Sequence, residues 1–163
     1  MLEQAKALPR PEADEIRRRT AAARETLATQ QLLLKEHKHP VIVLFEGFGA
    51  AGKGSMIRRI IKPLDPRFFS VDTMTTASEE EKRRPFLYRY FRRIPEAGTF
   101  LFLDGGWMAD VTRRRLDGSL SDADYKNHIR SVRRFERTLT DNGYLVLKFF
   151  FVIDKKEQRH RLD

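Results

Sequence analysis

The chain has 163 residues, of which 40% are hydrophobic, which is enough for one domain with a core and excludes general disorder. Lys and Arg number 32 against 23 for Asp and Glu, a formal net charge of +9 that favours a polyanionic partner. Cysteine is absent and no apolar run is long enough to cross a bilayer, which excludes disulfide frameworks, thiolate metal sites and membrane spans. We therefore expect a cytoplasmic protein without a membrane partner.

The N-terminal 38 residues are predicted to form a segment of their own. Residues 1–15 contain Pro9 and Pro11 among polar residues and are expected to be a poorly ordered lead-in. Residues 15–37 hold no Gly or Pro and are rich in helix formers, which predicts one amphipathic helix for packing or oligomerisation. This divides the chain into a lead-in and helix over residues 1–38 and a main domain over residues 39–163.

A predicted strand, a glycine-rich turn and a predicted helix then follow in direct succession. Residues 41–47, VIVLFEG, are an apolar, β-branched run typical of a strand buried on both faces. The turn GFGAAGKGS comes next, and residues 56–64, MIRRIIKPL, alternate apolar and basic residues at helical spacing. This order is the structural context that a phosphate-binding loop requires.

The remainder of the chain alternates predicted helices and strands. Helices are predicted over residues 79–93 and 121–143, and strands over residues 99–104 and 144–153. The three Phe residues 149–151 are expected in a buried strand. The alternation predicts an α/β fold with a mostly parallel sheet and helices on both faces. Because the chain ends about ten residues after its last strand, we expect a C-terminally truncated fragment, one half of a longer protein, or a short gene product.

The glycine-rich turn fits the pattern G-x-x-x-x-G-K. Small residues let consecutive backbone N–H groups turn inward to form an anion nest, and the helix N-terminus beyond adds its positive end. The lysine then reaches the bridging and terminal phosphate oxygens. The alternative, a turn that serves only tight packing of strand and helix, leaves the lysine unexplained. The predicted phosphate-binding residues are Gly47, Gly49, Ala50, Ala51, Gly52, Lys53, Gly54 and Ser55.

Asp104 follows four apolar residues at the carboxyl end of a predicted strand, where ligands bind in open α/β sheets. A carboxylate there commonly holds Mg²⁺ against nucleotide phosphates, and we predict this role for Asp104. The alternative is an Asp that only opens the turn formed with Gly105 and Gly106. In the common loop motif a Ser or Thr follows the lysine and binds magnesium, whereas here Gly54 follows it and Ser55 lies one place late.

Over about residues 40–162 the chain resembles the polyphosphate kinase 2 family. The resemblance is carried by EGFGAAGKGSMIRRI, LDPRFF, RPFLYRYFRRIPEAG, Asp104 with Trp107, FERTLTDNGYLVLKFFF, and Glu157-Gln158 with Arg161. It implies a P-loop kinase fold with three α/β/α layers. It also implies phosphoryl transfer between inorganic polyphosphate and a nucleotide (AMP, ADP or ATP) with Mg²⁺, in which Lys53 and Asp104 are catalytic and Asp104 is the metal ligand.

The segment around residues 84–87, RPFL, most resembles the tandem subgroup that includes polyphosphate:AMP phosphotransferases. In that subgroup two such domains are fused and one copy can be degenerate. The resemblance therefore implies either a homo-oligomer or a second fused domain as partner.

Several positions depart from the family pattern. The family's loop reads G-x-D-x-x-G-K-G, and its Asp is replaced here by Gly49. After the second strand the family reads D-R-S-W-Y with an Arg two places later, whereas residues 104–110 read DGGWMAD and Asp110 replaces that Arg. These changes remove one carboxylate and two cationic positions that would stabilise charge in the transition state. The fold inference is unaffected by them, but full catalytic competence does not follow.

Three hypotheses on function stay open at this stage. The first is an active polyphosphate-dependent nucleotide phosphotransferase, and the second is a catalytically degenerate copy with a structural or regulatory role. The third is another P-loop kinase or a nucleic-acid-stimulated ATPase, which the basic charge permits but the long match disfavours. Nucleic acid is accordingly the least favoured polyanionic partner.

Outside the loop, Arg89 is the best candidate for a further anion contact, because it lies between aromatic residues and matches the family. The basic runs 82–84, 92–93 and 113–115 are each expected to be solvated faces, with a channel for a phosphate chain as the alternative. Trp107 is predicted to pack in the core. The four His residues show no metal-binding spacing.

Overall fold

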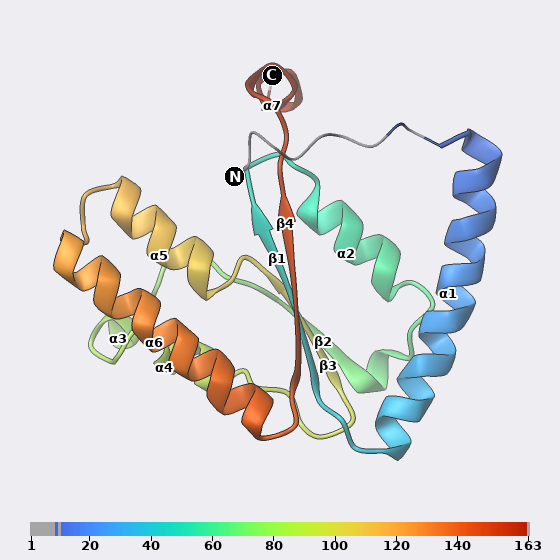
Figure 1. Ribbon diagram of the computed structural model, residues 1–163, viewed down its shortest axis with the longest axis horizontal. Helices are drawn as coiled ribbons and strands as arrows, with labels where there is room; N and C mark the ends of the chain where they lie inside the picture. The colour runs from blue at the N-terminus through green and yellow to red at the C-terminus, as the bar shows by residue number, and fades with distance from the viewer. Residues whose placement is uncertain (1–8, 10, 163) are drawn as a thin grey trace.

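A computed structural model describes Pro9 and residues 11–162, which form a three-layer α/β/α domain (Figure 1). The predicted α/β fold is therefore confirmed. The lead-in predicted for residues 1–15 lies mostly outside the described residues, and its last three residues already belong to a helix. That helix, α1 (Ala13–Glu36), confirms the prediction for residues 15–37 and begins two residues earlier.

Four parallel strands form the central sheet, in the order β2-β3-β1-β4. They are β1 (Val41–Gly47), β2 (Phe69–Thr73), β3 (Phe100–Asp104) and β4 (Leu145–Phe151). Phe45 of β1 stands opposite Asp104 of β3 on one side and Phe149 of β4 on the other. Because the strands are parallel, their carboxyl ends meet at one edge of the sheet, and the loop after β1 lies beside the end of β3.

One face of the sheet packs against α1 and α2 (Lys53–Ile61), drawn on the right in Figure 1. The odd-numbered residues of β1 point to this face and join a buried cluster with Ile57 of α2, while Leu27 and Leu34 of α1 pack against it. Gln31 of α1 is 2% exposed and exchanges two hydrogen bonds with the backbone of Asp65. These bonds tie α1 to the turn before the short 3-10 helix η2 (Pro66–Phe68), so a polar side chain on the buried stripe is satisfied.

The opposite face packs against α5 (Trp107–Leu116) and α6 (Asp122–Asp141). The even-numbered residues of β1 point to this face and meet Trp107, which is 1% exposed and contacts the rings of Tyr90 and Phe135 edge-on. Trp107 is thus a core residue, as predicted. Burial on both faces explains the unbroken apolar run of β1, since each fully buried Val, Leu, Ile or Phe contributes about 1.5–3 kcal/mol.

The single helix predicted over residues 79–93 is wrong. The structure has two short helices there, α3 (Glu79–Lys82) and α4 (Tyr88–Phe91). Pro85 lies between them, and a proline both lacks the N–H that a helix needs and disfavours helical backbone at the residue before it. Sequence analysis also missed β2 and α5, which are short and carry weak periodicity.

The burial expected for the last strand is wrong as well. β4 is an edge strand that pairs with β1 alone among the described strands, and Leu145, Phe149 and Phe150 are 47%, 48% and 57% exposed. Phe151, in contrast, packs against the cluster under α2. Apolar composition predicted a strand correctly, but it does not distinguish a central strand from an edge strand.

After β4 the chain turns into α7 (Lys155–Leu162) beyond the carboxyl end of the sheet (Figure 1). None of the helices in the described residues is long and apolar enough to cross a membrane. The division of the chain at residues 38 and 39 stays a prediction.

Replacing Gly47 by Ala should destabilise the domain strongly. Gly47 has φ of +122°, and a Cβ there would stand 2.1 Å from the carbonyl oxygen of Phe151 on the neighbouring strand. We expect the free energy of unfolding in urea to fall by about 3 kcal/mol or more. Gly143→Ala is the matched control, because Gly143 also has positive φ (+82°) but open space around it. That control should lose about 1–2 kcal/mol, and equal losses in the two variants would contradict the close backbone approach.

Candidate functional site

The glycine-rich loop joins β1 to α2 at the carboxyl edge of the sheet, as predicted. Its backbone takes left-handed φ values at Ala50 (+58°) and at Gly52 (+91°), which is the residue before the first turn of α2. The first N–H groups of α2, beginning at Lys53, have no acceptor within the helix and carry its partial positive charge. The loop and the helix start together present the donors that an anion nest requires.

Lys53 lies at the first position of α2 and is half-buried. Its Nζ donates to the carbonyl oxygen of Phe48 (3.0 Å), so the ammonium group bends back across the loop. The positive charge is therefore held beside the loop backbone. Ser55, in contrast, is exposed on the helix surface.

Asp104 ends β3 and faces the start of α2. Its Oδ2 lies 3.4 Å from the position that a Cβ on Gly54 would take, so the strand pairing brings the carboxylate beside the loop. In the described part of the chain, no group of three or more His, Cys, Asp or Glu is placed to hold a metal ion. One carboxylate beside a phosphate site nevertheless fits Mg²⁺, which is commonly held by one or two carboxylates together with substrate phosphates.

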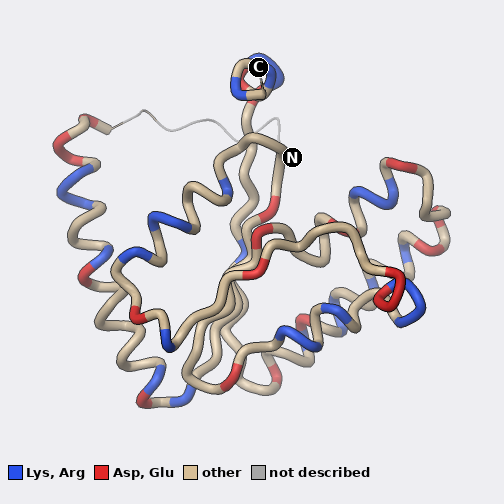
Figure 2. Tube along the Cα trace, turned by 180° about the vertical axis from the view of Figure 1, so that it is seen from behind, with Lys and Arg blue, Asp and Glu red and all other residues tan. Residues whose placement is uncertain are grey.

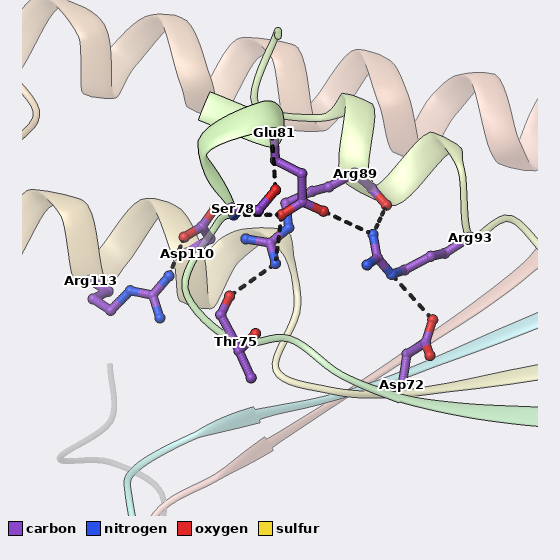
Figure 3. A network of polar contacts seen from close by, with 8 residues as sticks. All are labelled: Asp72, Thr75, Ser78, Glu81, Arg89, Arg93, Asp110 and Arg113. Atoms are coloured by element: carbon purple, nitrogen blue, oxygen red, sulfur yellow. Dashed lines mark hydrogen bonds and ion pairs between the residues drawn. The ribbon is translucent and has the colours of Figure 1, made fainter. Parts of the chain in front are cut away.

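Arg89 lies on α4, away from the loop, and is 4% exposed (Figure 3). Its Nη2 donates to the Thr75 carbonyl oxygen (2.9 Å) and lies 3.5 Å from Glu81 Oε2. Among the described residues, its Nε and Nη1 have no hydrogen-bond partner although both are buried. A buried guanidinium with unused donors is suited to an anionic ligand, since unpaired buried donors are costly.

Glu81 holds the guanidinium groups of Arg89 on α4 and of Arg93 just after it. It is the third residue of α3, where it forms a capping box with Ser78. The Ser78 N–H, followed by Arg89 and Arg93, lowers the pKa of the Glu81 carboxyl below its ordinary value. Arg93 in turn bridges Glu81 and Asp72 of β2, at 3.4 and 3.3 Å. Three elements are thereby joined around one carboxylate (Figure 3).

Three hollows adjoin around the side chain of Arg113 on α5. One of about 840 Å³ begins at Gly47, Phe48 and Gly49 of the loop, and a small one of about 160 Å³ follows along Gly105 and Gly106. The third, of about 520 Å³, contains Arg89. The line of hollows therefore leads from the loop toward the buried guanidinium of α4.

The third hollow is lined by charges of both signs, five Lys and Arg against three Asp and Glu, and Lys and Arg are spread over several helices of the molecule (Figure 2). Members of two predicted basic runs line it together with His128, and they are Lys82, Arg84, Arg113 and Arg114. Lys82, Arg84 and Arg113 are exposed, as expected for a solvated face, and the channel for a phosphate chain stays a prediction. The nearest acidic group to Arg113 is Asp110, which is 8% exposed and pairs with it.

Glu46, a buried carboxylate behind the loop, was not predicted as a functional residue. It is 7% exposed, and its Oε1 accepts the backbone N–H groups of Met108 and Ala109 (both 3.1 Å) at the start of α5. Burial raises the pKa of the Glu46 carboxyl, and these two N–H groups act in the opposite direction. A Cβ on Gly106 would stand 2.4 Å from this Oε1, so the carboxylate occupies the space of a side chain there. A lone Glu within the apolar run VIVLFEG was the available signal.

The chain matches the polyphosphate kinase 2 family over residues 10–163. It is 37% identical over 123 residues to a polyphosphate:AMP phosphotransferase of Pseudomonas syringae, covering 76% of this chain and 25% of the relative. It is 35% identical to an ADP-polyphosphate phosphotransferase of Pseudomonas aeruginosa, covering 76% and 40% of the two chains. The chain spans about a quarter to a half of the curated relatives it matches.

Solved structures agree with these matches. A Pseudomonas aeruginosa crystal structure named for polyphosphate kinase 2 superposes with a TM-score of 0.90 at 33% identity, over 100% of this chain and 35% of the other. Polyphosphate kinase 2 from Arthrobacter aurescens superposes with a TM-score of 0.85 at 26% identity, over 88% and 52% of the two chains. The recognition made from sequence motifs and the fold inferred with it are therefore confirmed.

Replacing Glu46 by Gln should change how stability depends on pH. Because burial raises the folded-state pKa of this carboxyl above its ordinary value of 4.5, the folded state binds the proton more tightly than the unfolded state. The wild type therefore loses stability as the pH rises through the interval between the unfolded and folded pKa values, and the variant does not. Urea unfolding between about pH 4 and pH 8 should show the variant gaining stability relative to the wild type. Glu96→Gln, at an exposed position, should show no such trend.

Proposed function

The chain belongs to the polyphosphate kinase 2 family, and on that premise we propose that it transfers phosphoryl groups between inorganic polyphosphate and AMP or ADP. The observation that carries the proposal is the anion nest between β1 and α2, with Lys53 across it and Asp104 beside it. Phosphoryl transfer depends mainly on positioning and on charge stabilisation, and these groups supply both. We further propose that the protein acts in the cytoplasm, as a homo-oligomer or beside a second domain of the same kind.

Within this proposal the loop binds the phosphate groups whose linking P–O bond is broken. The N–H groups of the loop and of the start of α2, apart from that of Ala51, which donates to the Phe48 carbonyl, hold the phosphate oxygens and orient the terminal group. They move no proton. Lys53 releases the Phe48 carbonyl and places its ammonium on the bridging and terminal oxygens, where negative charge increases as the bond breaks. The donors are preorganised because β1, which carries the loop, is buried on both faces.

Asp104 would hold Mg²⁺ together with the phosphate oxygens. When bound, the ion would neutralise charge on the transferred group. Asp104 is supported in this role by its place at the end of β3 and by the orientation of Oδ2 toward the start of α2. Glu46, although near in the sheet, is already engaged with two backbone N–H groups of α5 and is therefore a structural carboxylate.

The hollow that contains Arg89 would bind the phosphate of the acceptor nucleotide. Its buried Nε and Nη1 donors support this assignment, and Arg113 lies between this hollow and the loop. The two substrates would then approach each other along the line of hollows, which is the arrangement that direct transfer needs.

A second candidate function is phosphate binding without turnover, in a degenerate copy of the family domain. Asp110 favours it, because this buried carboxylate stands where the family has an Arg and neutralises Arg113. Gly49 favours it too, because the family's loop carboxylate is missing there. The two candidates share the nest and differ only in catalysis.

Lys53→Ala should abolish turnover, since it removes the cation that faces the transferred group. The assay contains the purified chain, long-chain polyphosphate, Mg²⁺ and either AMP or ADP. We expect the rate to fall by about 100-fold or more. Lys62→Ala, at the far end of α2, removes the same charge and should retain activity. If the wild type binds polyphosphate but forms no product, the degenerate copy is favoured. If it neither binds polyphosphate nor forms product, the phosphate site is refuted.

Arg89→Met should selectively weaken binding of the acceptor nucleotide. We expect the KM for AMP or ADP to rise by about tenfold while the KM for polyphosphate changes little, because one charge-assisted contact is lost. Arg83→Met is the matched control, since Arg83 is exposed in the same segment. Thermal melting of both variants establishes that they are folded. A rise in the KM for polyphosphate instead would assign the hollow to the phosphate chain.

A further inference from the structure

Two side chains of α7 contact the phosphate loop from the far end of the described chain. Gln158 Nε2 donates to the carbonyl oxygen of Gly49 (3.0 Å), and Arg161 Nη1 donates to that of Ala50 (3.2 Å). The two residues are three apart, so they lie on one face of the helix. In Figure 1, α7 stands beyond the carboxyl ends of β1 and β4, where the loop begins. Neither residue belongs to the phosphate-binding set predicted from the loop motif.

The acceptors are consecutive carbonyls, and this decides how the loop is oriented. Phe48, the residue before them, has a carbonyl that already accepts from Lys53 Nζ and from the N–H of Ala51. With the two bonds from α7, three carbonyls in succession are held by donors. A trans peptide is planar, so holding the oxygen of one residue turns the N–H of the next residue to the opposite side. The bond from Gln158 therefore directs the Ala50 N–H to the inside, and the bond from Arg161 supports the turn in which the Ala51 N–H donates to the Phe48 carbonyl. Both bonds keep carbonyl dipoles from facing an anion.

The need for such support is visible in the backbone. Ala50 takes a left-handed conformation (φ +58°), which its Cβ disfavours. Its Cα lies between the two carbonyls that α7 holds, that of Gly49 and its own. Alternation of left-handed and right-handed residues is the geometry that creates an anion nest. External hydrogen bonds thus offset an unfavourable conformation that anion binding requires.

The α7 side chains are themselves held in place. Arg161 Nε donates to Glu157 Oε1 (2.6 Å) one turn earlier, so the guanidinium is oriented before it reaches the loop. Asp154 accepts the N–H of Glu157 through its side chain (2.7 Å) and that of Gln158 through its carbonyl, which fixes the start of α7. The capped helix begins four residues after β4 ends, and at that strand end the Phe151 carbonyl accepts the Phe48 N–H.

We infer that Gln158 and Arg161 are positioning residues that hold the phosphate loop in its anion-binding conformation. The inference rests on the proposed function, because it assumes that the loop binds phosphate. It adds a role for α7: residues more than 100 positions from the loop in sequence determine the orientation of its donors.

The experiment measures the Kd for tripolyphosphate by titration calorimetry for the wild type and for Arg161→Met, Gln158→Leu and Arg159→Met. Arg159→Met is the matched control, because it removes the same charge from the same helix. In the structure Arg159 lines a separate shallow hollow with Lys155, Lys156 and His160. We expect Arg161→Met to raise the Kd about tenfold and Gln158→Leu about fivefold, with less than a twofold change for Arg159→Met. Arg161→Lys, which keeps a donor and the charge, should return the Kd to within about threefold of the wild type.

The outcomes separate this inference from the proposed function. Equal losses for Arg161→Met and Arg159→Met would show that only net charge acts, and unchanged Kd values for both loop-facing variants would likewise overturn the positioning role. A wild type that binds no tripolyphosphate would refute the phosphate site itself, and with it any role for α7. Melting temperatures are recorded for every variant, and Arg161→Lys supplies a folded test of the site if Arg161→Met is unstable.

Discussion

The pairing of β1 with both of its neighbours is the constraint on which the candidate site depends. β1 lies between β3 and β4, parallel to each, and six of its seven residues are buried. Its carboxyl end therefore has a defined position relative to Asp104 and to the end of β4. At Gly47 the neighbouring backbone comes so close that a side chain has no space. The loop starts from this point, and its geometry follows from the sheet.

Two carboxylates, the buried Glu46 and the partly buried Glu81, organise the polar contacts around α5 and α4. Glu46 holds the start of α5 through two backbone N–H groups, and Glu81 holds two arginines of the segment around α4. Each satisfies donors that would otherwise be unpaired inside the protein. Arg89 keeps two free N–H groups in spite of this. The network therefore places the Arg89 guanidinium in a hollow and leaves two of its N–H groups available for hydrogen bonds.

The departures from the family pattern are local, and the structure gives three of them, Gly106, Asp110 and Gly49, a physical setting. Gly106 leaves room for the Glu46 carboxylate, which occupies the space that a side chain there would need. Asp110 is paired with Arg113, one turn along α5. Gly49 contributes no charge, but its carbonyl accepts a hydrogen bond from α7. Fold and anion nest are thus retained while the charge beside the nest differs, which is why binding and turnover are separate questions.

Local sequence by itself determined the loop, the strand before it and the long helices α1 and α6, because glycine spacing, apolar runs and helical periodicity are properties of neighbouring residues. The alternation of helices and strands predicted the α/β fold, and the end of an apolar run predicted Asp104; the family motifs specified a P-loop kinase fold. Pro85 is a local residue, and its helix-breaking effect was available from the sequence. Only the tertiary structure decided that β4 is an exposed edge. The same is true of the partners of Glu46, and of Gln158 and Arg161 on the loop carbonyls. Those facts depend on contacts between residues distant in sequence, and no local pattern encodes which groups the packed sheet brings together.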